Sequence, residues 1–506
     1  MQTSTTEIIG QTFQEISDIV TKTMGAKGQL AIISDEFSRP YLTDDGVTVA
    51  RECMKQDDPF KKMVATSMIE AASNTEKTAF DGTTLTVLLT NEFYKAGQSL
   101  IKQGMHPQIA SDKVKEQVDK ALEFLNEETI KIDESNSKLV KDVANITTKI
   151  PTIGELVYDA YLHAGSQMNV IIEHDRKNPS SSIEHIDGMI LDAGYFSETF
   201  KNLCNDEDKF VAENAKIILL SEGLITPVAL NKFFASISDT SQPLVFILDK
   251  SFNPETLSNI LNSLVENKLP FMMVFINESD AESLFLDIAA KTNGIIQSSA
   301  LGTTDYIIDY AGTADKIIVE QNKTTIIASG NKDNIQKRID SYNKELDDNK
   351  YTIGFVKQDQ LTRRISNLDK GVTKIRLACS TVTEFKTIRM KLDDAIGAVR
   401  CACRDGVVLG GGKTLYSISN KVEIIDKALR MPMKTIINNA GLELPSRDML
   451  NKDKWAGLDV KRNSIVNLKN CGIIDSRTSI EQAIRNASSI ACQYLKAYIL
   501  INGIKK

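Results

Sequence analysis

The spacing of apolar residues divides the chain into helical and mixed segments. Before about His163 and after Gly371, apolar side chains recur every three or four positions, as in Glu7–Met24 and Phe60–Phe80. This period predicts amphipathic α-helices. After Gly188 the pattern changes to short apolar runs that alternate with helical stretches, which predicts βαβ units around a mostly parallel sheet.

The elements of the middle segment can be placed individually. The predicted strands are Ile217–Leu220, Leu244–Leu248, Phe271–Ile276, Ile317–Val319 and Thr325–Ala328. The predicted helices between the first four are at about Thr226–Ser238, Pro254–Asn267 and Asp280–Lys291, and a helical hairpin follows around Ile335–Leu346 and Leu361–Leu368. The chain therefore reads as a multi-domain protein of α plus α/β class, in which an α/β domain is inserted into a helical domain built from both chain ends.

Composition and charge narrow the class of protein. The chain has 506 residues, enough for about three domains. Its net charge of -7 argues against nucleic acid as a partner, because phosphate binding needs a basic face. The seven cysteines and four histidines lack the spacing of metal ligands. The N-terminus lacks a signal-peptide pattern, and no apolar run is long enough to span a bilayer. These features predict a cytoplasmic protein with no membrane partner.

The stretch Asp81–Thr84 lies between two long helical patterns. Gly82 allows close approach of the backbone, Thr83 and Thr84 offer hydroxyl groups, and Asp81 can hold Mg²⁺. A helix start of this kind suits a phosphate group. Asp, Gly and Thr are also ordinary N-cap residues, so a plain helix start is the alternative interpretation.

Other segments offer similar chemistry. Tyr41–Val49 contains Asp44-Asp45-Gly46, which predicts a tight hairpin with a carboxylate at its tip. Asp394 borders the apolar face of a helix at Lys391–Arg404, either as a solvated acid or as a base near a phosphate. The glycines Gly410–Gly412 follow a short strand, and Asp475 ends another apolar step; both could approach a nucleotide.

Five segments together resemble the group I chaperonins, the GroEL type, and indicate a divergent member. They are TMGAKG at 23–28, TDDGVTVARE at 43–52, DGTT at 81–84, DDAIGAVRCACRDGVVLGGG at 393–412 and CGIIDSRTSIEQAIRNASSIA at 471–491. Each is a weak signal alone, but their order and separations match the family over nearly the whole chain.

The resemblance implies three domains and an ATP-dependent molecular chaperone. The equatorial domain is expected at residues 1–129 and 405–506, the intermediate domain at 130–186 and 372–404, and the apical domain at 187–371. The implied cofactors are ATP and Mg²⁺, with K⁺ as a further candidate. The implied partners are further copies of the chain in a seven-fold ring, non-native client proteins and a co-chaperonin lid. An alternative is a ring-forming, protein-binding scaffold or holdase with little ATPase activity.

The resemblance also assigns site residues. Asp81 matches the metal ligand, and Asp394 and Asp45 match the catalytic acids. The nucleotide-binding positions are Thr23, Met24, Gly25, Ala26, Asp44, Gly82, Thr83, Thr84, Leu85, Gly410, Gly411, Gly412, Asp459 and Asp475. The chain departs from the family where Ala26 replaces Pro, Leu85 replaces Thr and Asp44 replaces Lys, and Asp459 falls in the run that usually contacts the base. The departures at Asp44, Leu85 and Asp459 motivate the scaffold alternative.

The central segment carries candidate positions for binding client proteins. They are the apolar residues Tyr195, Phe196, Phe200, Phe233, Phe234, Ile237, Leu257, Ile260, Leu261 and Leu264. The alternative is that they are core residues of amphipathic elements, which we expect for about half of them. Adjacent phenylalanines are hard to bury on one helix face, which favours partial exposure of Phe233 and Phe234.

Overall fold

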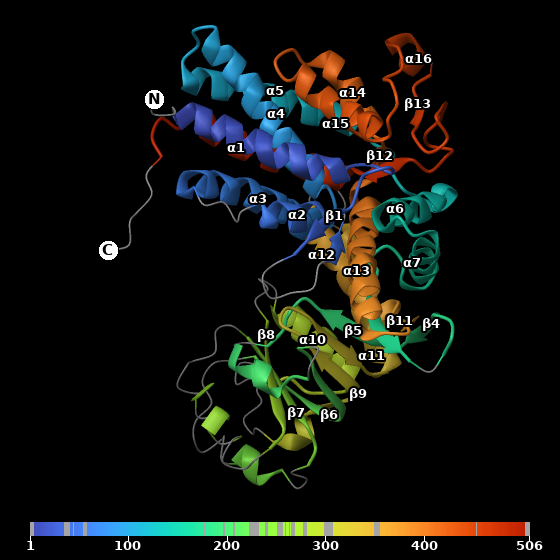
Figure 1. Ribbon diagram of the computed structural model, residues 1–506. Helices are drawn as coiled ribbons and strands as arrows, with labels where there is room; N and C mark the ends of the chain where they lie inside the picture. Colours follow the sequence, from blue (N-terminus) through green and yellow to red (C-terminus); the bar gives the residue numbers. More distant parts are fainter. Residues whose placement is uncertain are drawn as a thin grey trace. The chain divides into compact units, whose positions relative to one another are not determined.

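The chain divides into two compact units in the computed structural model (Figure 1). Unit 1 contains residues 1–161 and 382–506, and unit 2 contains residues 162–381. The structure describes residues 5–34, 41–43, 45–53, 58–176, 178–195, 198–205, 208–221, 232–237, 241–249, 257–258, 260–262, 264, 269–276, 281–297, 307–348, 355–451 and 453–500. Unit 2 is an insertion into a helical unit built from both chain ends, which confirms the predicted fold class. The division into three domains stays a prediction.

Unit 1 is mainly helical. Its helices are α1 (Thr5–Val20), η1 (Thr21–Thr23), α2 (Gly46–Glu52), α3 (Pro59–Ala79), α4 (Thr83–Lys102), α5 (Pro107–Glu127), η2 (Glu134–Asn136), α6 (Lys138–Thr148), α7 (Pro151–Ala164), α13 (Val382–Asp405), α14 (Lys413–Ile418), η5 (Ser419–Lys421), α15 (Asp426–Asn439), α16 (Arg447–Asn451) and α17 (Arg477–Leu495). Its strands form antiparallel pairs: β1 (Ala31–Ile33) with β2 (Tyr41–Thr43), β12 (Val407–Leu409) with β15 (Ile474–Ser476), and β13 (Ala456–Asp459) with β14 (Ser464–Asn467).

Helices from both chain ends share one core. Figure 1 shows α1, α3 and α4 side by side, and α17 packs against α3, α4 and α5. Fully buried residues of this core include Ile9, Phe13 and Ile16 of α1, Leu89 of α4 and Ile484 of α17. Because burying apolar surface is the main driving force of folding, the last helix completes a core that the first helices begin. Loops from both ends are thereby held on one scaffold.

The hairpin predicted for Tyr41–Val49 is wrong. Strand β2 pairs with β1, with Ile33 opposite Tyr41, and a helix begins at Gly46. Asp45 has a φ of -75° and its carboxylate accepts hydrogen bonds from the N–H groups of Val47 (3.3 Å) and Thr48 (2.9 Å). An Asp-Gly hairpin of the common type needs positive φ angles, whereas this geometry is a helix N-cap. Capping by Asp45 therefore replaces the expected turn.

Unit 2 contains a larger and a smaller sheet. Its elements are β3 (Val170–Asp175), β4 (Ser182–Ile186), β5 (Gly188–Leu191), η3 (Glu198–Leu203), β6 (Phe210–Leu220), β7 (Leu244–Asp249), β8 (Phe271–Ile276), α10 (Ala281–Thr292), η4 (Ile308–Tyr310), β9 (Gly312–Val319), β10 (Thr324–Ile327), α11 (Lys332–Asp348), α12 (Phe355–Asp369) and β11 (Val372–Ala378). The five predicted strands correspond to β6, β7, β8, β9 and β10. The predicted helix at Asp280–Lys291 corresponds to α10, while most of Thr226–Ser238 and part of Pro254–Asn267 lie outside the described residues.

The prediction of a mostly parallel sheet is wrong. Among the strands that the structure describes, the six-stranded sheet has the order β5-β10-β9-β6-β7-β8, and only the β6–β7 and β7–β8 pairs are parallel. The other pairs are antiparallel. Strands β9 and β10 are joined by a tight turn in which the N–H of Glu320 donates to the carbonyl of Lys323 (2.8 Å). So short a connection can join only antiparallel strands, and the sheet is mixed.

The predicted helical hairpin corresponds to α11 and α12, which pack together and against α10. A buried polar cluster joins the three helices. The carboxylate of Asp287 in α10 pairs with Arg338 (3.0 Å) and lies 3.8 Å from Arg364, and it accepts a hydrogen bond from Tyr342 (2.9 Å). Because Asp287 is only 1% exposed, its charge depends on these partners. None of the described helices has the length and apolar character needed to cross a membrane.

Candidate functional site

The segment Asp81–Thr84 connects α3 to α4. Phe80 ends α3 in a left-handed conformation, and Gly82, with φ +90°, is the N-cap of α4. Among the described residues no side chain caps this helix start, so the N–H groups of its first turn are left for another acceptor. Asp81 accepts a hydrogen bond from the N–H of Gly82 (2.7 Å). The segment thus presents the positive end of a 20-residue helix, which favours an anion.

A chain of hydrogen-bonded polar groups connects α17 and α3 to this segment. The amide of Asn486 in α17 donates to the hydroxyl of Thr75 in α3 (2.9 Å), which lies 2.9 Å from the hydroxyl of Thr86 in α4. Thr86 in turn donates to the carbonyl oxygen of Gly82 (3.0 Å). Both threonines are fully buried. These three residues were missed in the sequence, where the only signal is a polar side chain at a buried helical position.

The start of α2 meets the start of α4. A Cβ atom on Gly46 would lie 2.3 Å from the hydroxyl oxygen of Thr84 and 3.1 Å from both the hydroxyl oxygen of Thr83 and the amide nitrogen of Thr84. Only a glycine fits this contact without a shift of its neighbours. Asp45, the N-cap of α2, is thereby held close to Asp81–Thr84.

Five carboxyl groups gather near this helix start. They belong to Asp45, Glu76 of α3, Asp81, Asp394 of α13 and Asp475 of β15. Burial raises the pKa of Asp394 to about 7, and the negative charges of Glu76, Asp45 and Asp81 act in the same direction. Burial also raises the pKa of Asp475 to about 7, with a further contribution from Asp81. The pKa values of Asp81 and Glu76 are raised as well, chiefly by burial.

Glu76 was missed in the sequence, because its neighbours come from α2 and α13 and its place on α3 carries no local signal. The other four acids were predicted. Their convergence from four separate segments is what distinguishes this helix start from an ordinary one.

The crowded negative charge fits a divalent cation. No three His, Cys, Asp or Glu side chains of the described residues form a metal site by themselves. Mg²⁺ in proteins is commonly held by one or two carboxylates together with phosphate oxygens and water. The site therefore suits a Mg²⁺ ion that is bound partly by Asp81 and partly by a polyphosphate. Such an ion would offset the repulsion among the carboxylates.

The two predicted glycine loops both pack against α15. Gly25 has φ +89°, and a Cβ atom there would lie 2.9 Å from the side chain of Ile436. Gly412 has φ +74°, and a Cβ atom there would lie 2.5 Å from the amide nitrogen of Met433. The side chain of Asn439 donates to the carbonyl oxygen of Met24 (3.0 Å). One helix thus positions the loops Thr23–Ala26 and Gly410–Gly412, which are far apart in the sequence.

The second glycine loop is also tied to Asp475. The N–H of Gly410 donates to the carbonyl oxygen of Ile473 (2.9 Å), and Val408 lies opposite Asp475 in the β12–β15 pair. The first loop follows η1, which contacts α4. The structure therefore places both glycine loops on elements that border the carboxyl cluster.

Two predicted positions, Leu85 and Asp459, do not direct their side chains to this site, and a third lies outside the described residues. Leu85 is buried in the helical core, so it can offer only its backbone N–H. Asp459 lies at the β13–β14 turn, where its carboxylate accepts hydrogen bonds from the N–H groups of Lys461 (2.9 Å) and Arg462 (3.3 Å). This carboxylate is engaged in its own hairpin. Asp44 lies outside the described residues.

The candidate client-binding residues of unit 2 are mostly buried. Core positions are occupied by Tyr195, Phe200, Phe233, Leu257, Ile260 and Leu264, as the amphipathic alternative predicts, whereas Phe234, Ile237 and Leu261 are only partly buried. Phe233 and Phe234 form an edge-to-face pair with ring centroids 5.4 Å apart. The expected partial exposure is therefore found for Phe234, but it is wrong for Phe233, which is buried. Phe196 lies outside the described residues.

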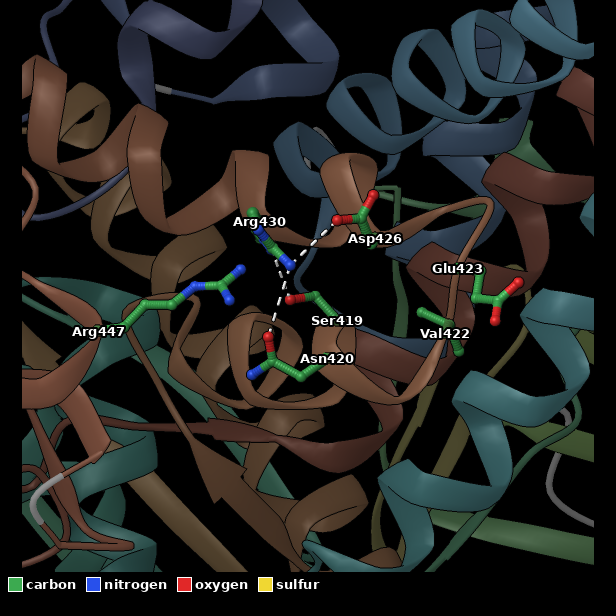
Figure 2. Close-up of a pocket in the computed structure, with 7 residues that line it drawn as sticks. All are labelled: Ser419, Asn420, Val422, Glu423, Asp426, Arg430 and Arg447. Atoms are coloured by element: carbon green, nitrogen blue, oxygen red, sulfur yellow. Dashed lines mark hydrogen bonds and ion pairs between the residues drawn. The ribbon is translucent and has the colours of Figure 1, made fainter.

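A separate pocket is formed by η5, α15 and the start of α16. Figure 2 shows Arg430 bound to Asp426 (3.0 Å) and to the hydroxyl of Ser419 (3.0 Å), with Arg447 extending toward Arg430. The charge of Arg430 is balanced by the carboxylate of Asp426. None of the predicted site residues that the structure describes lines this pocket.

Together, these features bring an uncapped helix start, five carboxyl groups and two glycine loops from both chain ends into one region around the start of α4. The family model that matches the chain is "TCP-1/cpn60 chaperonin family", over residues 16–502. The chain belongs to this family, which confirms the resemblance carried by the five motifs.

Solved structures match the whole fold. One is the chaperonin gp146 from the bacteriophage EL 2 (Pseudomonas aeruginosa), crystallised in the presence of ATP-BeFx in two crystal forms. Crystal form II has a TM-score of 0.80 at 20% sequence identity, covering 100% of both chains. Crystal form I has a TM-score of 0.72 at 20% identity, covering 99% of this chain and 98% of the other. The similarity therefore extends to every part of the chaperonin fold.

Proposed function

We propose that this chaperonin binds and hydrolyses ATP at the start of α4 and uses the reaction to drive protein folding in a ring assembly. The observation that carries the proposal is the convergence of an uncapped helix N-terminus with carboxyl groups from separate segments. The N–H groups of Thr83 and Thr84 would hold phosphate oxygens, and Asp81 would hold Mg²⁺. Gly82, whose own N–H is bonded to Asp81, would allow the phosphate to approach the backbone closely. The ion supplies neutralisation of the phosphate charge. Crystallisation of the gp146 relative in the presence of ATP-BeFx supports the assignment of the nucleotide.

Asp394 is proposed to orient the attacking water and accept its proton. Phosphoryl transfer depends mainly on positioning and charge stabilisation, and a carboxylate whose pKa lies near 7 is suited to accept a proton at neutral pH. Asp45 is proposed to act beside it. Its hydrogen bonds cap α2, and Gly46, the first residue of that helix, packs against Thr83 and Thr84.

The remaining predicted residues are proposed to surround the nucleoside. Thr23–Ala26 and Gly410–Gly412 bring their backbones close to α15, and Asp475 is available to accept a hydrogen bond from a ribose hydroxyl. The backbone N–H of Leu85 would complete the first turn of α4. Because its carboxylate is engaged within the β13–β14 hairpin, Asp459 would contribute to the site only by holding the shape of that hairpin.

The catalytic assignment is tested by comparing Asp394→Ala with Asp393→Ala. Asp393 is the adjacent acid of α13, largely exposed and paired with Arg389 (3.6 Å). We expect Asp394→Ala to retain Mg²⁺·ATP affinity and to lower kcat by about 10²–10⁴-fold, the range for loss of a general base. Asp393→Ala should keep the wild-type kcat. Equal turnover by wild type and Asp394→Ala in a phosphate-release assay would show that the assignment is wrong.

The assembly and its partners form a second part of the proposal. Family membership supports a homo-oligomeric ring, taken as seven-fold, with unfolded proteins as clients and a co-chaperonin lid as a further partner. Phe234, Ile237 and Leu261, the partly buried members of the apolar set, are the proposed client contacts. Electron microscopy of the purified protein with and without Mg²⁺·ATP should show rings whose subunits change conformation. Particles without rotational symmetry would contradict the proposal.

The alternative function is a ring-forming scaffold or holdase with little ATPase activity. It is favoured by the burial of Leu85 in the core and by the engagement of Asp459 in its hairpin, because both side chains are withdrawn from a nucleotide. Phosphate release with and without a denatured protein separates the two functions. Turnover stimulated by the denatured protein supports the folding machine, and binding of that protein without turnover supports the holdase.

A further inference from the structure

Phe80 occupies a backbone conformation that ordinarily selects glycine. It is the C-cap of α3 with φ 59° and ψ 12°, and its N–H donates to the carbonyl oxygen of Glu76 (2.8 Å). The left-handed region is disfavoured for side chains with a Cβ atom, and helices that end in this way usually carry glycine. An aromatic residue here needs a compensating contact elsewhere. Asp81, the proposed Mg²⁺ ligand, is the next residue in the chain.

The compensating contact is made with Gly397 in the middle of α13. A Cβ atom on Gly397 would lie 2.1 Å from Cγ of Phe80 and 2.4 Å from its Cδ1 and Cδ2 atoms. The ring therefore rests directly on the backbone of α13 at a point where no side chain fits. Glycine is itself unfavourable inside a helix. Two locally unfavourable residues thus meet each other, and the contact accounts for both.

This contact lies on the face of α13 that carries Asp394. Residues 394, 397 and 401 follow the helical spacing of three and four, so they share one face. The thiol of Cys401 donates to the carbonyl oxygen of Thr78 (3.6 Å) at the end of α3. The carboxyl group of Asp394 interacts electrostatically with that of Asp81. A change in the seating of Phe80 on Gly397 would therefore change the position of Asp394 relative to Asp81.

We propose that Phe80 is a positioning residue for ATP hydrolysis, and that its ring, seated on Gly397, sets the placement of the Asp394 carboxyl group over the phosphate site. The proposal rests on the function proposed above. The ring contacts α13, and it acts through the placement of that helix. Nucleotide affinity depends on the start of α4 and is independent of this contact, whereas turnover depends on it.

Three variants of the full-length protein test the proposal. Gly397→Ala adds a methyl group that would clash with the ring of Phe80. Phe80→Gly removes the ring and places a glycine where the backbone is left-handed. The double variant combines both changes and contains no clash. A matched control is Gly10→Ala in α1, where the new methyl group would meet Tyr94 at an ordinary 3.6 Å. Each protein is assayed for Mg²⁺·ATP affinity and for kcat.

We expect both single variants to keep Mg²⁺·ATP affinity within about threefold of wild type and to lower kcat at least about tenfold, as for a catalytic group displaced from its working geometry. The double variant should have a kcat no lower than that of Phe80→Gly, because the added methyl group no longer meets a ring. The control should match wild type. If Gly397→Ala does not fold, Phe80→Gly and the double variant carry the test.

Two outcomes would overturn the inference. One is a wild-type kcat in Phe80→Gly. The other is a double variant whose loss of kcat equals the product of the losses in the two single variants. Asp394→Ala separates these failures from failure of the proposed function. If Asp394→Ala is inactive while Phe80→Gly turns over normally, only the positioning role is wrong. If Asp394→Ala turns over normally, the catalytic assignment on which this inference rests is wrong.

Discussion

Replacement of Gly46 by alanine should weaken nucleotide binding without unfolding the protein. Gly46 begins α2 and does not have a positive φ angle, so alanine can adopt its backbone conformation. The difficulty is space, because the new methyl group would lie 2.3 Å from the hydroxyl oxygen of Thr84 and 3.1 Å from its amide nitrogen. The hydroxyl can rotate away, but the amide nitrogen belongs to the first turn of α4 and can move only with the backbone.

The magnitude follows from the cost of overpacking. An added methyl group in a well-packed contact typically costs about 1–3 kcal/mol. If the clash displaces the N–H groups that hold the phosphates, the same free energy corresponds to about 5- to 150-fold weaker nucleotide binding. Alanine also favours the helix that begins at this residue, by up to about 1 kcal/mol. The midpoint of thermal unfolding without nucleotide should therefore change little while affinity falls.

Titration calorimetry with Mg²⁺·ADP measures this directly, because the product is not turned over. The matched control is Gly10→Ala, whose methyl group makes an ordinary contact of 3.6 Å with Tyr94 and which should bind with wild-type affinity. Wild-type affinity in Gly46→Ala would refute the placement of phosphates at the start of α4. An equal loss in Gly10→Ala would show that the effect is not specific to this contact.

Three further changes probe other parts of the structure. Thr86→Val removes a buried hydroxyl group that bonds to Thr75 and Gly82, which should cost about 1–3 kcal/mol of stability; a lowered unfolding midpoint that bound Mg²⁺·ADP partly restores would support it. Asp475→Asn should raise the unfolding midpoint of the nucleotide-free protein in EDTA at pH 8 but not at pH 4. The pKa of Asp475 is raised to about 7 in the fold, so its contribution to stability is complete below its unfolded pKa of about 4 and is lost as pH rises through 7; an equal effect at both pH values contradicts this. Asp287→Asn leaves Arg338 and Arg364 without their buried carboxylate, a loss of about 3–5 kcal/mol for such pairs, and hydrogen exchange of α11 and α12 should rise; unchanged exchange would contradict the anchoring role.

Local patterns in the sequence identified most of the elements. The spacing of Ile9, Phe13 and Ile16 marked α1 because a helix turns once per 3.6 residues, and the apolar runs marked β6 and β7 because a buried strand needs apolar side chains on both faces. The motif Asp81–Thr84 was correctly predicted as a helix start, whereas its role in binding phosphate stays a prediction. These features depend on residues close together in the chain, which is why the sequence determined them.

The arrangement of the site was decided by tertiary structure. Asp45 looked like a turn residue, yet its carboxylate caps α2, because the helix supplies N–H groups that the turn cannot. Glu76 joins the carboxyl cluster only because α13 and the start of α2 lie beside α3. The contact of Phe80 with Gly397 joins residues from opposite ends of the sequence. The sequence determines which groups can bind phosphate and metal, whereas packing of the two chain ends into one core determines which of them meet.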